Sequence, residues 1–543
     1  MTALLHHLLI VPVLVPLVAG ASLLFLAEQR RARIALAVGS VLVQAVAAGT
    51  LLYLTTDAMP HMWTEGVGVY ALGAWPAPFG IVFVVDRLAA LMLVLTALIG
   101  LAALVYSLAY WDRVAPAFHS MLQFLLMGLN GAFLTGDLFN LFVFFEVLLA
   151  ASYGLLLHGA GSVRVKASLH YVTVNLLASF LFLVGIAMVY GITGTLNMAD
   201  LPARISQLDP GDRALFGSGA AILGGAFLVK AGVWPLNFWL PAAYTAASSP
   251  VGALFALMTK VGVYAALRIG TLLSSADVET SFIDVGLFYG GAATVAYGTI
   301  GTLSAHQLGR VVSFSVVTST GLMFMALGLR LQSLTAPVLL YLASSALATS
   351  AFFMLNGLAQ RTRNVPMREA ADVAPMPDVI YHGFGVGPPD PLSPTDEVGV
   401  AIPAAMAFLG MAFVCCVLLI VGLPPLSGFL AKFALLRATA GPNLLAAGAP
   451  YGAAFCAAVV VSGMAALVAF TRSGLRLFWT VSAQRTPRLR MIEVAPTSLL
   501  ILACLVLTVA AAPVMTYLDS AARSLHAPEV YVRVVAETTG VLP

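Results

Sequence analysis

Long apolar stretches recur from one end of the chain to the other, separated by short polar connections. A stretch of roughly 20 apolar residues spans a bilayer as one helix, so the pattern predicts an all-α polytopic membrane protein with about 14 transmembrane helices. The predicted spans are centred near residues 14, 44, 96, 125, 148, 180, 223, 260, 293, 320, 347, 412, 460 and 507.

The seventh and twelfth predicted spans are each interrupted by glycine and proline. Gly232 and Pro235 interrupt the seventh span, and Pro424, Pro425 and Gly428 interrupt the twelfth. Proline removes a backbone donor and clashes with the preceding turn, so both helices are expected to unwind locally. Broken helices at corresponding positions are typical of inverted-repeat transporters, whose ion sites lie near the membrane midplane. Simple packing kinks are the alternative interpretation.

One stretch does not have the composition of a membrane segment. Residues 361–402 hold seven prolines and several carboxylates, and this composition is too polar and proline-rich to form a core. The segment is predicted to be a polar loop, which either rests on a neighbouring subunit or serves as a plain linker.

The overall composition agrees with a chain surrounded by lipid. Hydrophobic residues make up 61% of it and charged residues 9%, against roughly 25% charged in soluble proteins. The net charge of +3 comes without a basic patch and interleaved aromatics, so no nucleic-acid partner is expected. The four cysteines have no metal-ligand or disulfide spacing, and no metal or cofactor is expected.

Three of the four lysines lie inside apolar spans: Lys230, Lys260 and Lys432. A charged lysine near the bilayer centre costs roughly 2.5–3.5 kcal/mol on insertion scales, so each is by default a functional-site hypothesis. Lys230 and Lys432 each stand beside an interrupted span, and Lys432 is expected to occupy the position in the second half that Lys230 occupies in the first. The natural function of such residues is to move charge.

Glu146 is one of the few acids well inside an apolar span. The charge state of a buried carboxylate depends on whether an ammonium group lies beside it. Two unit charges about 7 Å apart interact by roughly 2 kcal/mol at an effective dielectric near 20. A glutamate–lysine pair is therefore a natural proton switch, and a static buried ion pair is the alternative.

Other titratable residues give weaker signals. Asp137 begins its span and is either part of the proton path or only a helix cap, and Asp86 is adjacent to its own counter-charge, Arg87. His170 and His306 lie at the starts of spans, where a hydrogen-bonded interfacial histidine is the competing interpretation.

The basic residues in the connections predict the orientation, because cytoplasmic loops carry an excess of lysine and arginine. With the N-terminus outside, the inside connections hold Arg30, Arg31, Arg33, Arg113, Arg164, Lys166, Arg310, Arg361, Arg363, Arg368 and the cluster from Arg472 to Arg490. The outside connections then hold Arg204, Arg213, Arg268, Arg330, Arg437, Arg523 and Arg533. Both termini are therefore expected on the outer side of the membrane, which is the periplasm in a bacterium, and the first apolar run is expected to be a retained helix.

Three segments together resemble a known family. Residues 135–149 and 190–201 resemble the D subunit of Mrp-type (also called Pha or Mnh) multisubunit cation/proton antiporters. Residues 229–250 are similar to a signature shared with the proton-pumping membrane subunits of respiratory complex I. The resemblance extends from about residue 80 to 475.

The resemblance implies a fold of 14 helices with two inverted five-helix repeats. It divides the chain into N-terminal helices 1–3 (1–110), a first repeat of helices 4–8 (111–275), a second repeat of helices 9–13 with the polar loop (276–475), and helix 14 with a C-terminal tail (476–543). It further implies that Glu146 and Lys230 form the acid–lysine pair, that Lys260 is the central lysine and that Lys432 is the terminal lysine on the broken twelfth helix.

The chain departs from the wider superfamily at its eleventh span. Relatives often carry histidine and lysine there, whereas this chain has Ser345 and Thr349. Hydroxyl groups and water can carry protons but cannot hold a charge. Continuity between Lys260 and Lys432 is therefore open, with His306 as a candidate for bridging them.

The resemblance implies a proton-translocating subunit of a Na⁺ or K⁺/H⁺ antiporter in the bacterial cytoplasmic membrane, working with other membrane subunits. The first alternative is a proton-pumping subunit of a respiratory NADH dehydrogenase or a related hydrogenase. An independent solute carrier is a further alternative. A membrane-embedded enzyme is disfavoured because the sequence has no nucleophile motif, metal-ligand spacing or phosphate loop.

Overall fold

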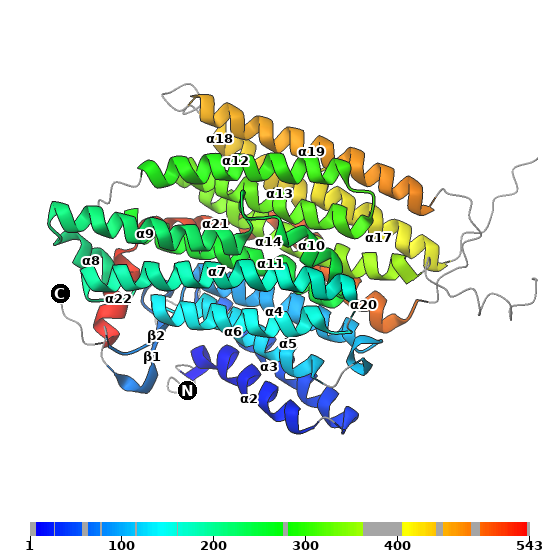
Figure 1. Ribbon diagram of the computed structural model, residues 1–543, viewed down its shortest axis with the longest axis horizontal. Coiled ribbons are helices and arrows are strands. Elements are labelled where there is room, and N and C mark those ends of the chain that lie inside the picture. Colours follow the sequence, from blue (N-terminus) through cyan, green and yellow to red (C-terminus); the bar gives the residue numbers. More distant parts are fainter. Residues whose placement is uncertain are drawn as a thin grey trace, which may run out of the picture.

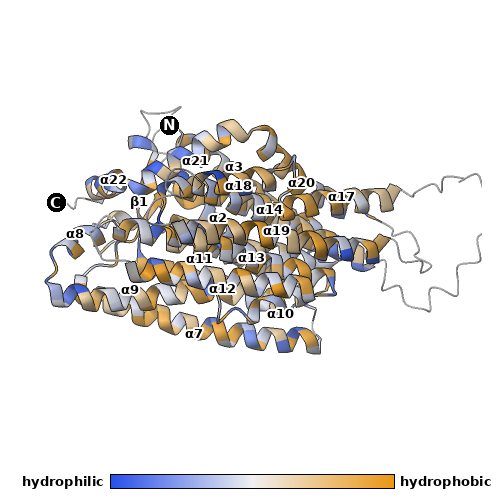
Figure 2. Ribbon diagram, turned by 90° about the horizontal axis from the view of Figure 1, so that it is seen from above, coloured by the Kyte–Doolittle hydropathy of each residue, from blue (hydrophilic) through white to orange (hydrophobic). Residues whose placement is uncertain are grey.

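The computed structural model describes residues 7–26, 28–56, 63–75, 79–114, 117–159, 161–274, 281–361, 404–440, 449–478 and 489–539. Most of these residues belong to long helices that run side by side along one direction (Figure 1). Hydrophilic residues lie mainly near the ends of these helices, and apolar residues cover their length (Figure 2). This is the arrangement expected of a bundle whose sides face lipid.

The helices follow one another in four groups along the chain. The first group comprises η1 (His7–Ile10), α2 (Val11–Phe25), α3 (Arg30–Leu54) and α4 (Arg87–Ser107). The second comprises η4 (Trp111–Arg113), α5 (Phe118–Leu134), α6 (Leu138–Leu157), α7 (Ser162–Thr193), α8 (Leu201–Ser206), α9 (Pro210–Ala231), α10 (Trp239–Ala246) and α11 (Ser249–Ser274). The third comprises α12 (Ser281–Ser304), α13 (Leu308–Gly328), α14 (Gln332–Arg361), α17 (Ala404–Val421), α18 (Ser427–Thr439) and α19 (Ala449–Phe478). The last comprises α20 (Met491–Val509), α21 (Ala511–His526) and α22 (Glu529–Thr539).

The all-α polytopic fold predicted from the sequence is confirmed. A helix lies at each predicted span centre, with α9–α10 and α17–α18 as the two interrupted spans. Among the described residues, twelve helices are long and apolar enough to cross a membrane. The count of 14 spans, the two inverted repeats and the four domain boundaries stay predictions, and the predicted polar loop 361–402 lies almost entirely outside the described residues.

Three helices form the centre of the bundle. The share of buried residues in an apolar 18-residue stretch is 94% for α11, 94% for α14 and 89% for α13. The corresponding share is only 33% in α17 and α20, which therefore lie at the edge. Because α11 carries Lys260, one of the predicted functional lysines is placed at the most enclosed position of the bundle.

The two interrupted helices break in the same way. Gly232 ends α9 and Gly422 ends α17, with positive φ angles of 74° and 81° that glycine adopts without steric cost. In each case the N–H of the next residue donates to a carbonyl five residues earlier: Val233 to Leu228 at 2.9 Å, and Leu423 to its counterpart Leu418 at 3.0 Å. The backbone groups released by each break are thus partly satisfied by the helix that it ends.

Two features were absent from the sequence-based prediction. Strands β1 (Gly68–Ala71) and β2 (Val82–Val85) form an antiparallel hairpin between α3 and α4, with Gly68 opposite Val85 and Ala71 opposite Val82. The short helical turns η2 (Thr64–Gly66) and η3 (Leu72–Ala74) flank β1. The predicted C-terminal tail instead forms α21 and α22, which lie against the bundle at the end that carries the hairpin (Figure 1), called the hairpin end below.

Candidate functional site

Glu146 and Lys230 form an ion pair between α6 and α9. The Lys230 ammonium lies 3.5 Å from Glu146 Oε1 and 5.0 Å from the centre of the Phe145 ring. The Lys230 side chain is 3% exposed, whereas the Glu146 side chain is 35% exposed. The pair therefore has a buried cation on one side and a carboxylate that reaches the lateral surface on the other.

Ser179 on α7 joins the two charged groups. Its hydroxyl donates a hydrogen bond to Glu146 Oε1 and accepts one from Lys230 Nζ at 3.0 Å. The sequence analysis did not single out Ser179, although a hydroxyl in the middle of an apolar span is a visible signal. A proton moving between the carboxylate and the lysine has this hydroxyl as a direct intermediate.

The ion pair is closer than the separation assumed from the sequence. At 3.5 Å, two unit charges interact by about 5 kcal/mol at an effective dielectric of 20 and by about 1 kcal/mol in bulk water. Since the carboxylate is partly exposed, its interaction with Lys230 lies between these limits. Either limit is large enough for the charge on one residue to influence the charge on the other.

Lys260 lies at the centre of the bundle and is 1% exposed. Its ammonium donates to Ser319 Oγ at 2.7 Å and to Thr320 Oγ1 at 3.4 Å, both on α13. Hydroxyl oxygens accept hydrogen bonds without contributing a counter-charge. These two partners of Lys260 are therefore polar but uncharged. No carboxylate among these partners stabilises the protonated form of the lysine.

The helices that carry Lys230 and Lys260 approach closely at Gly262. A Cβ atom built at Gly262 would lie 2.8 Å from the Ala231 side chain and 2.9 Å from the Phe227 carbonyl. Only glycine fits at this contact, because real Cβ atoms essentially never come within 3.0 Å of such atoms. The close contact of α9 with α11 brings the segments with the two lysines together.

Lys432 on α18 is held by the broken end of α17. Its ammonium donates to the carbonyls of Ile420 at 3.1 Å and Val421 at 2.8 Å. Free carbonyls at a helix C-terminus carry partial negative charge and favour a cation. Lys230 precedes its break on α9, whereas Lys432 follows its break on α18; the expected equivalence of the two lysines stays a prediction.

A small polar cavity of about 30 Å³ separates the partners of Lys260 from Lys432. This cavity is lined by Ser319, whose hydroxyl accepts a hydrogen bond from Lys260, and by Lys432. The other polar side chains that line it are Thr302, Ser315, Thr318, Tyr341, Ser344, Ser345, Thr349 and Ser462. About 10–15 Å³ is enough to hold a water molecule when polar partners are present. Ser345 and Thr349 on α14 thus line a cavity with room for water.

His306 lies away from this group. It is exposed in the turn between α12 and α13, with Arg476 Nη1 3.3 Å from its Nδ1 atom. Ser319 is 13 residues further along the chain, which is roughly 20 Å of helix. The geometry therefore does not bring His306 beside the central lysine, and its part in proton transfer stays a prediction. His170, likewise, is exposed on α7 and interacts with the Lys166 carbonyl of its own helix.

Asp137 is the N-cap of α6. Its Oδ1 atom accepts a hydrogen bond from the backbone N–H of Asn140 at 2.8 Å. Burial raises the pKa of the Asp137 carboxyl above its usual value. The geometry thus agrees with the capping role that the sequence left open, and a capping side chain satisfies one of the free donors at a helix start.

Asp86 has a different partner from the one that the sequence suggested. Arg268 Nη1 and Nη2 donate to its two carboxylate oxygens at 2.7 and 2.6 Å, and both side chains are 7% exposed. Burial acts to raise the pKa of Asp86, but the Arg268 guanidinium outweighs it and holds that pKa below its usual value. Arg268 was counted in an outside connection, and this assignment is wrong because it lies within α11.

Arg268 is a buried cation that the sequence analysis missed. It lies eight residues after Lys260, about two helical turns, and therefore on a similar face of α11. Its guanidinium also lies over the rings of Tyr264 and Tyr531, at 5.6 and 5.3 Å from their centres. The spacing from Lys260 was the signal that could have identified it. Because Tyr531 belongs to α22, this cation also ties the C-terminal helices to the core.

The described residues contain no group of three or more histidine, cysteine, aspartate or glutamate side chains that could hold a metal ion. The site consists of one carboxylate, three lysines and the hydroxyls between them. Such an arrangement can accept, hold and pass on protons, and it offers no nucleophile activated by an adjacent base.

Comparison with known proteins gives consistent results over almost the whole chain. Residues 135–378 match the family model described as NADH:quinone oxidoreductase/Mrp antiporter, TM. The D subunit of a probable K(+)/H(+) antiporter of Rhizobium meliloti is 47% identical over 97% of this chain and 97% of its own length. The D subunit of a Na(+)/H(+) antiporter of Alkalihalophilus pseudofirmus is 32% identical over 98% of this chain and 99% of its own.

A solved structure agrees in fold. A chain in the structure of the Mrp complex from Dietzia sp. superposes with a TM-score of 0.80 at 24% identity, covering 98% of this chain and 99% of that one. Identity at this level supports the fold, whereas the full-length matches to the two D subunits support the family. The chain therefore belongs to the D-subunit family of Mrp-type multisubunit monovalent cation/proton antiporters.

Proposed function

We propose that this chain is the proton-translocating subunit of a multisubunit antiporter that exchanges protons for a monovalent cation. The protons move through Glu146, Lys230, Lys260 and Lys432, in that order along the bundle. The chain is accordingly a transporter subunit rather than an enzyme. The observation that carries the proposal is the presence of three buried lysines, each held by polar partners, in helices that otherwise bury apolar side chains.

The path has a charged first part and a hydroxyl-lined second part. Ser179 connects Glu146 with Lys230, and the close approach of α9 and α11 leads on to Lys260. From Lys260, the Ser319 hydroxyl leads to the polar cavity that Lys432 also lines. Water in this cavity, with Ser345 and Thr349 as partners, carries the proton over the part of the path where relatives use charged side chains.

K⁺ is the first candidate for the exported cation, and Na⁺ is the second. The relative named for K(+)/H(+) exchange is 47% identical to this chain, and the one named for Na(+)/H(+) exchange is 32% identical. Both ions belong in any test, because the one carboxylate of the described site, Glu146, is paired with Lys230 and does not by itself distinguish K⁺ from Na⁺.

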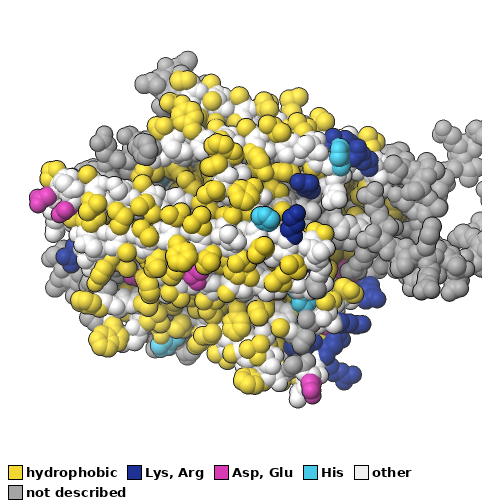
Figure 3. Space-filling model, in the orientation of Figure 1, with side chains coloured by type: hydrophobic (Ala, Val, Ile, Leu, Met, Phe, Trp, Pro, Cys, Tyr) yellow, Lys and Arg dark blue, Asp and Glu magenta, His cyan; other side chains and the backbone are white. Residues whose placement is uncertain are grey.

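The chain resides in the bacterial cytoplasmic membrane together with other membrane subunits, and both of its ends face outward. Lys and Arg side chains gather toward one end of the molecule in the view of Figure 3. The hairpin and α22 lie at the opposite end (Figure 1). The positive-inside rule directs the basic end to the cytoplasm.

The test is proton movement in everted membrane vesicles that contain the complete complex. A pH-sensitive dye reports the collapse of a preformed proton gradient after separate additions of K⁺ and Na⁺. Lys230→Ala and Glu146→Ala are expected to abolish the cation-triggered response while the complex still assembles. The matched control is Lys166→Ala, since Lys166 is an exposed lysine near the start of α7, and its removal is expected to leave exchange unchanged.

Two results would overturn the proposal. Wild-type exchange in Glu146→Ala or Lys230→Ala would show that protons do not pass through the pair. The absence of a cation response, with NADH-driven acidification that depends on Lys230, would assign the chain to a redox-driven proton pump instead.

A further inference from the structure

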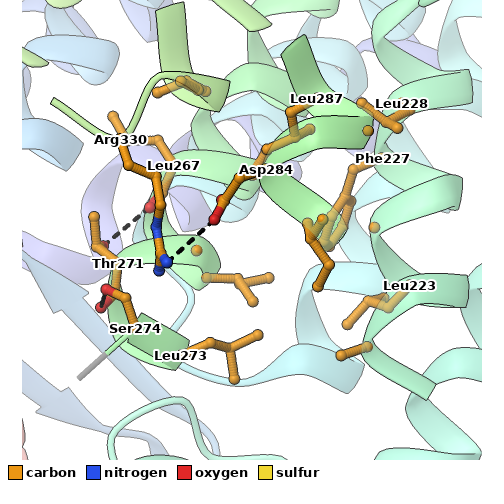
Figure 4. Close-up of a pocket in the computed structure, with 18 of the residues that line it drawn as sticks. Leu223, Phe227, Leu228, Leu267, Thr271, Leu273, Ser274, Asp284, Leu287 and Arg330 are labelled. Carbon is orange, nitrogen blue, oxygen red and sulfur yellow. Dashed lines mark hydrogen bonds and ion pairs between the residues drawn. The ribbon is translucent and has the colours of Figure 1, made fainter. Parts of the chain in front are cut away.

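A second, much larger cavity lies beside the part of α9 that carries Lys230. It has a volume of about 490 Å³ and lies at the hairpin end, among α9, α11, α12 and the start of α14. Leu223, Phe227 and Leu228 line one side, while the Arg330–Asp284 ion pair lies on the opposite side (Figure 4). The cavity is thus apolar over most of its wall and polar at one edge.

The polar edge is fixed in place by contacts between helices. Arg330 Nη1 lies 3.1 Å from Asp284 Oδ2, which ties the turn before α14 to the first turn of α12. Thr335 Oγ1 lies 2.8 Å from His526 Nε2 on α21. These contacts join elements on three sides, so the cavity belongs to the folded bundle and is more than an accidental gap at one flexible side chain.

Glycines keep the cavity open. Gly224 on α9 and Gly270 on α11 both line it, and a Cβ atom built at either glycine meets no other atom within 4 Å. Gly270 and Ser274 are exposed although α11 is otherwise among the most buried helices. Both positions line the cavity, and the cavity is partly open to the surroundings of the bundle.

We infer that this cavity binds one acyl chain of a membrane phospholipid. The surroundings of a membrane-spanning bundle supply apolar chains at high local concentration, and an apolar cavity excludes water. The cavity volume of about 490 Å³ is roughly 30 to 50 times the 10–15 Å³ that one water molecule needs. A space of this size and apolar character admits an extended acyl chain.

A helix of a partner subunit fits the cavity poorly. A helix with its side chains is about 10–12 Å across and rises 5.4 Å per turn, so a single turn fills on the order of 400–600 Å³. The cavity volume of 490 Å³ accommodates about one turn, too little for a helix that crosses the membrane. The lipid chain is the better match in both size and chemistry, with its ester and headgroup at the edge formed by Arg330 and Asp284.

The bound chain would lie next to the proton path. Phe227 lines the cavity and comes three residues before Lys230 on α9, so an occupant there lies about one turn from the lysine. An acyl chain in this place keeps water of the hairpin end away from the Glu146–Lys230 pair. Lipid binding is a property of this cavity in its own right and can be measured without transport.

The test is photocrosslinking with a phospholipid that carries a diazirine near the end of one acyl chain. The complete complex is reconstituted with this lipid, irradiated and digested, and the modified peptides are identified by mass spectrometry. Adducts are expected on cavity-lining segments of α9, α11 and α12. Gly270→Phe is expected to reduce their yield by about tenfold, because its side chain occupies the space of the lipid chain.

Two further variants make the outcome specific. Gly224→Leu fills the cavity from the α9 wall and replaces Gly270→Phe if that complex does not assemble. Gly39→Phe is the matched control, since Gly39 is exposed on α3 and a Cβ atom there meets no other atom within 4 Å. Cavity adducts that are absent in the native complex, or equally abundant in the filled variants, would overturn the inference. Lipid adducts that appear on another subunit's helix facing α9 and α12, in place of adducts on the cavity walls, would overturn the inference in favour of a protein occupant.

Discussion

Replacing Ser179 by alanine is the most informative single change at the site. The Ser179 hydroxyl is bonded to both charged groups, donating to Glu146 Oε1 and accepting from Lys230 at 3.0 Å. Alanine removes both hydrogen bonds and leaves every charge in place. The variant therefore separates the role of the bridging hydroxyl from the role of the ion pair, which charge-removing substitutions cannot do.

The expected effect follows from the strength of these bonds. A hydrogen bond to a charged group contributes about 1.5–3 kcal/mol, and the 3.5 Å separation of Lys230 from Glu146 lets the two approach and recover part of the loss. A net loss of about 2 kcal/mol in the proton-transfer step corresponds to a roughly 30-fold lower exchange rate, since each 1.36 kcal/mol is a factor of ten.

The assay is the dye-reported cation/proton exchange in everted vesicles, with the amount of assembled complex measured in the same membranes. Ser218→Ala is the matched control, because its exposed hydroxyl donates only to the Ala214 carbonyl of its own helix at 3.2 Å. Ser179→Thr keeps a hydroxyl and is expected to restore most of the activity. Undiminished exchange in Ser179→Ala at equal assembly would refute a path through this hydroxyl.

Substitutions at three other positions test separate parts of the structure. Thr349→Val keeps the side-chain shape but removes a hydroxyl from the small polar cavity, so exchange is expected to fall about tenfold or more; unchanged exchange would exclude this hydroxyl from the path. Arg268→Ala leaves the Asp86 carboxylate buried without its bidentate partner, and the expected loss of about 3–5 kcal/mol of stability should appear as a clearly lower melting temperature of the purified complex. If the melting temperature does not change, the Asp86–Arg268 ion pair does not contribute to the stability of the bundle. Asp137→Asn preserves the cap of α6 and is expected to leave exchange unaltered, whereas Asp137→Ala should cost about 1 kcal/mol of stability; loss of exchange in the asparagine variant would instead make Asp137 a member of the proton path.

The sequence determined the fold class and the principal charged residues. Apolar stretches of bilayer length have one stable form in lipid, a helix that satisfies its own backbone, so the span positions could be read directly from hydropathy. The two breaks followed from glycine and proline, whose local effect does not depend on distant residues. Lys230, Lys260 and Lys432 were visible because a lysine in an apolar span is costly and therefore rare.

Only the tertiary structure decided which side chains meet. Ser179 lies 33 residues from Glu146 and 51 from Lys230, and Arg268 lies 182 residues from Asp86; no local pattern encodes such contacts. Hydroxyl-bearing residues are also common in membrane helices and inexpensive to bury when they bond to their own backbone. Their gathering between Lys260 and Lys432 therefore became visible only when α13 and α14 were packed together with α17, α18 and α19. The sequence thus identified the charged residues inside the apolar spans. The packing of the helices determined which side chains contact these residues and formed both cavities.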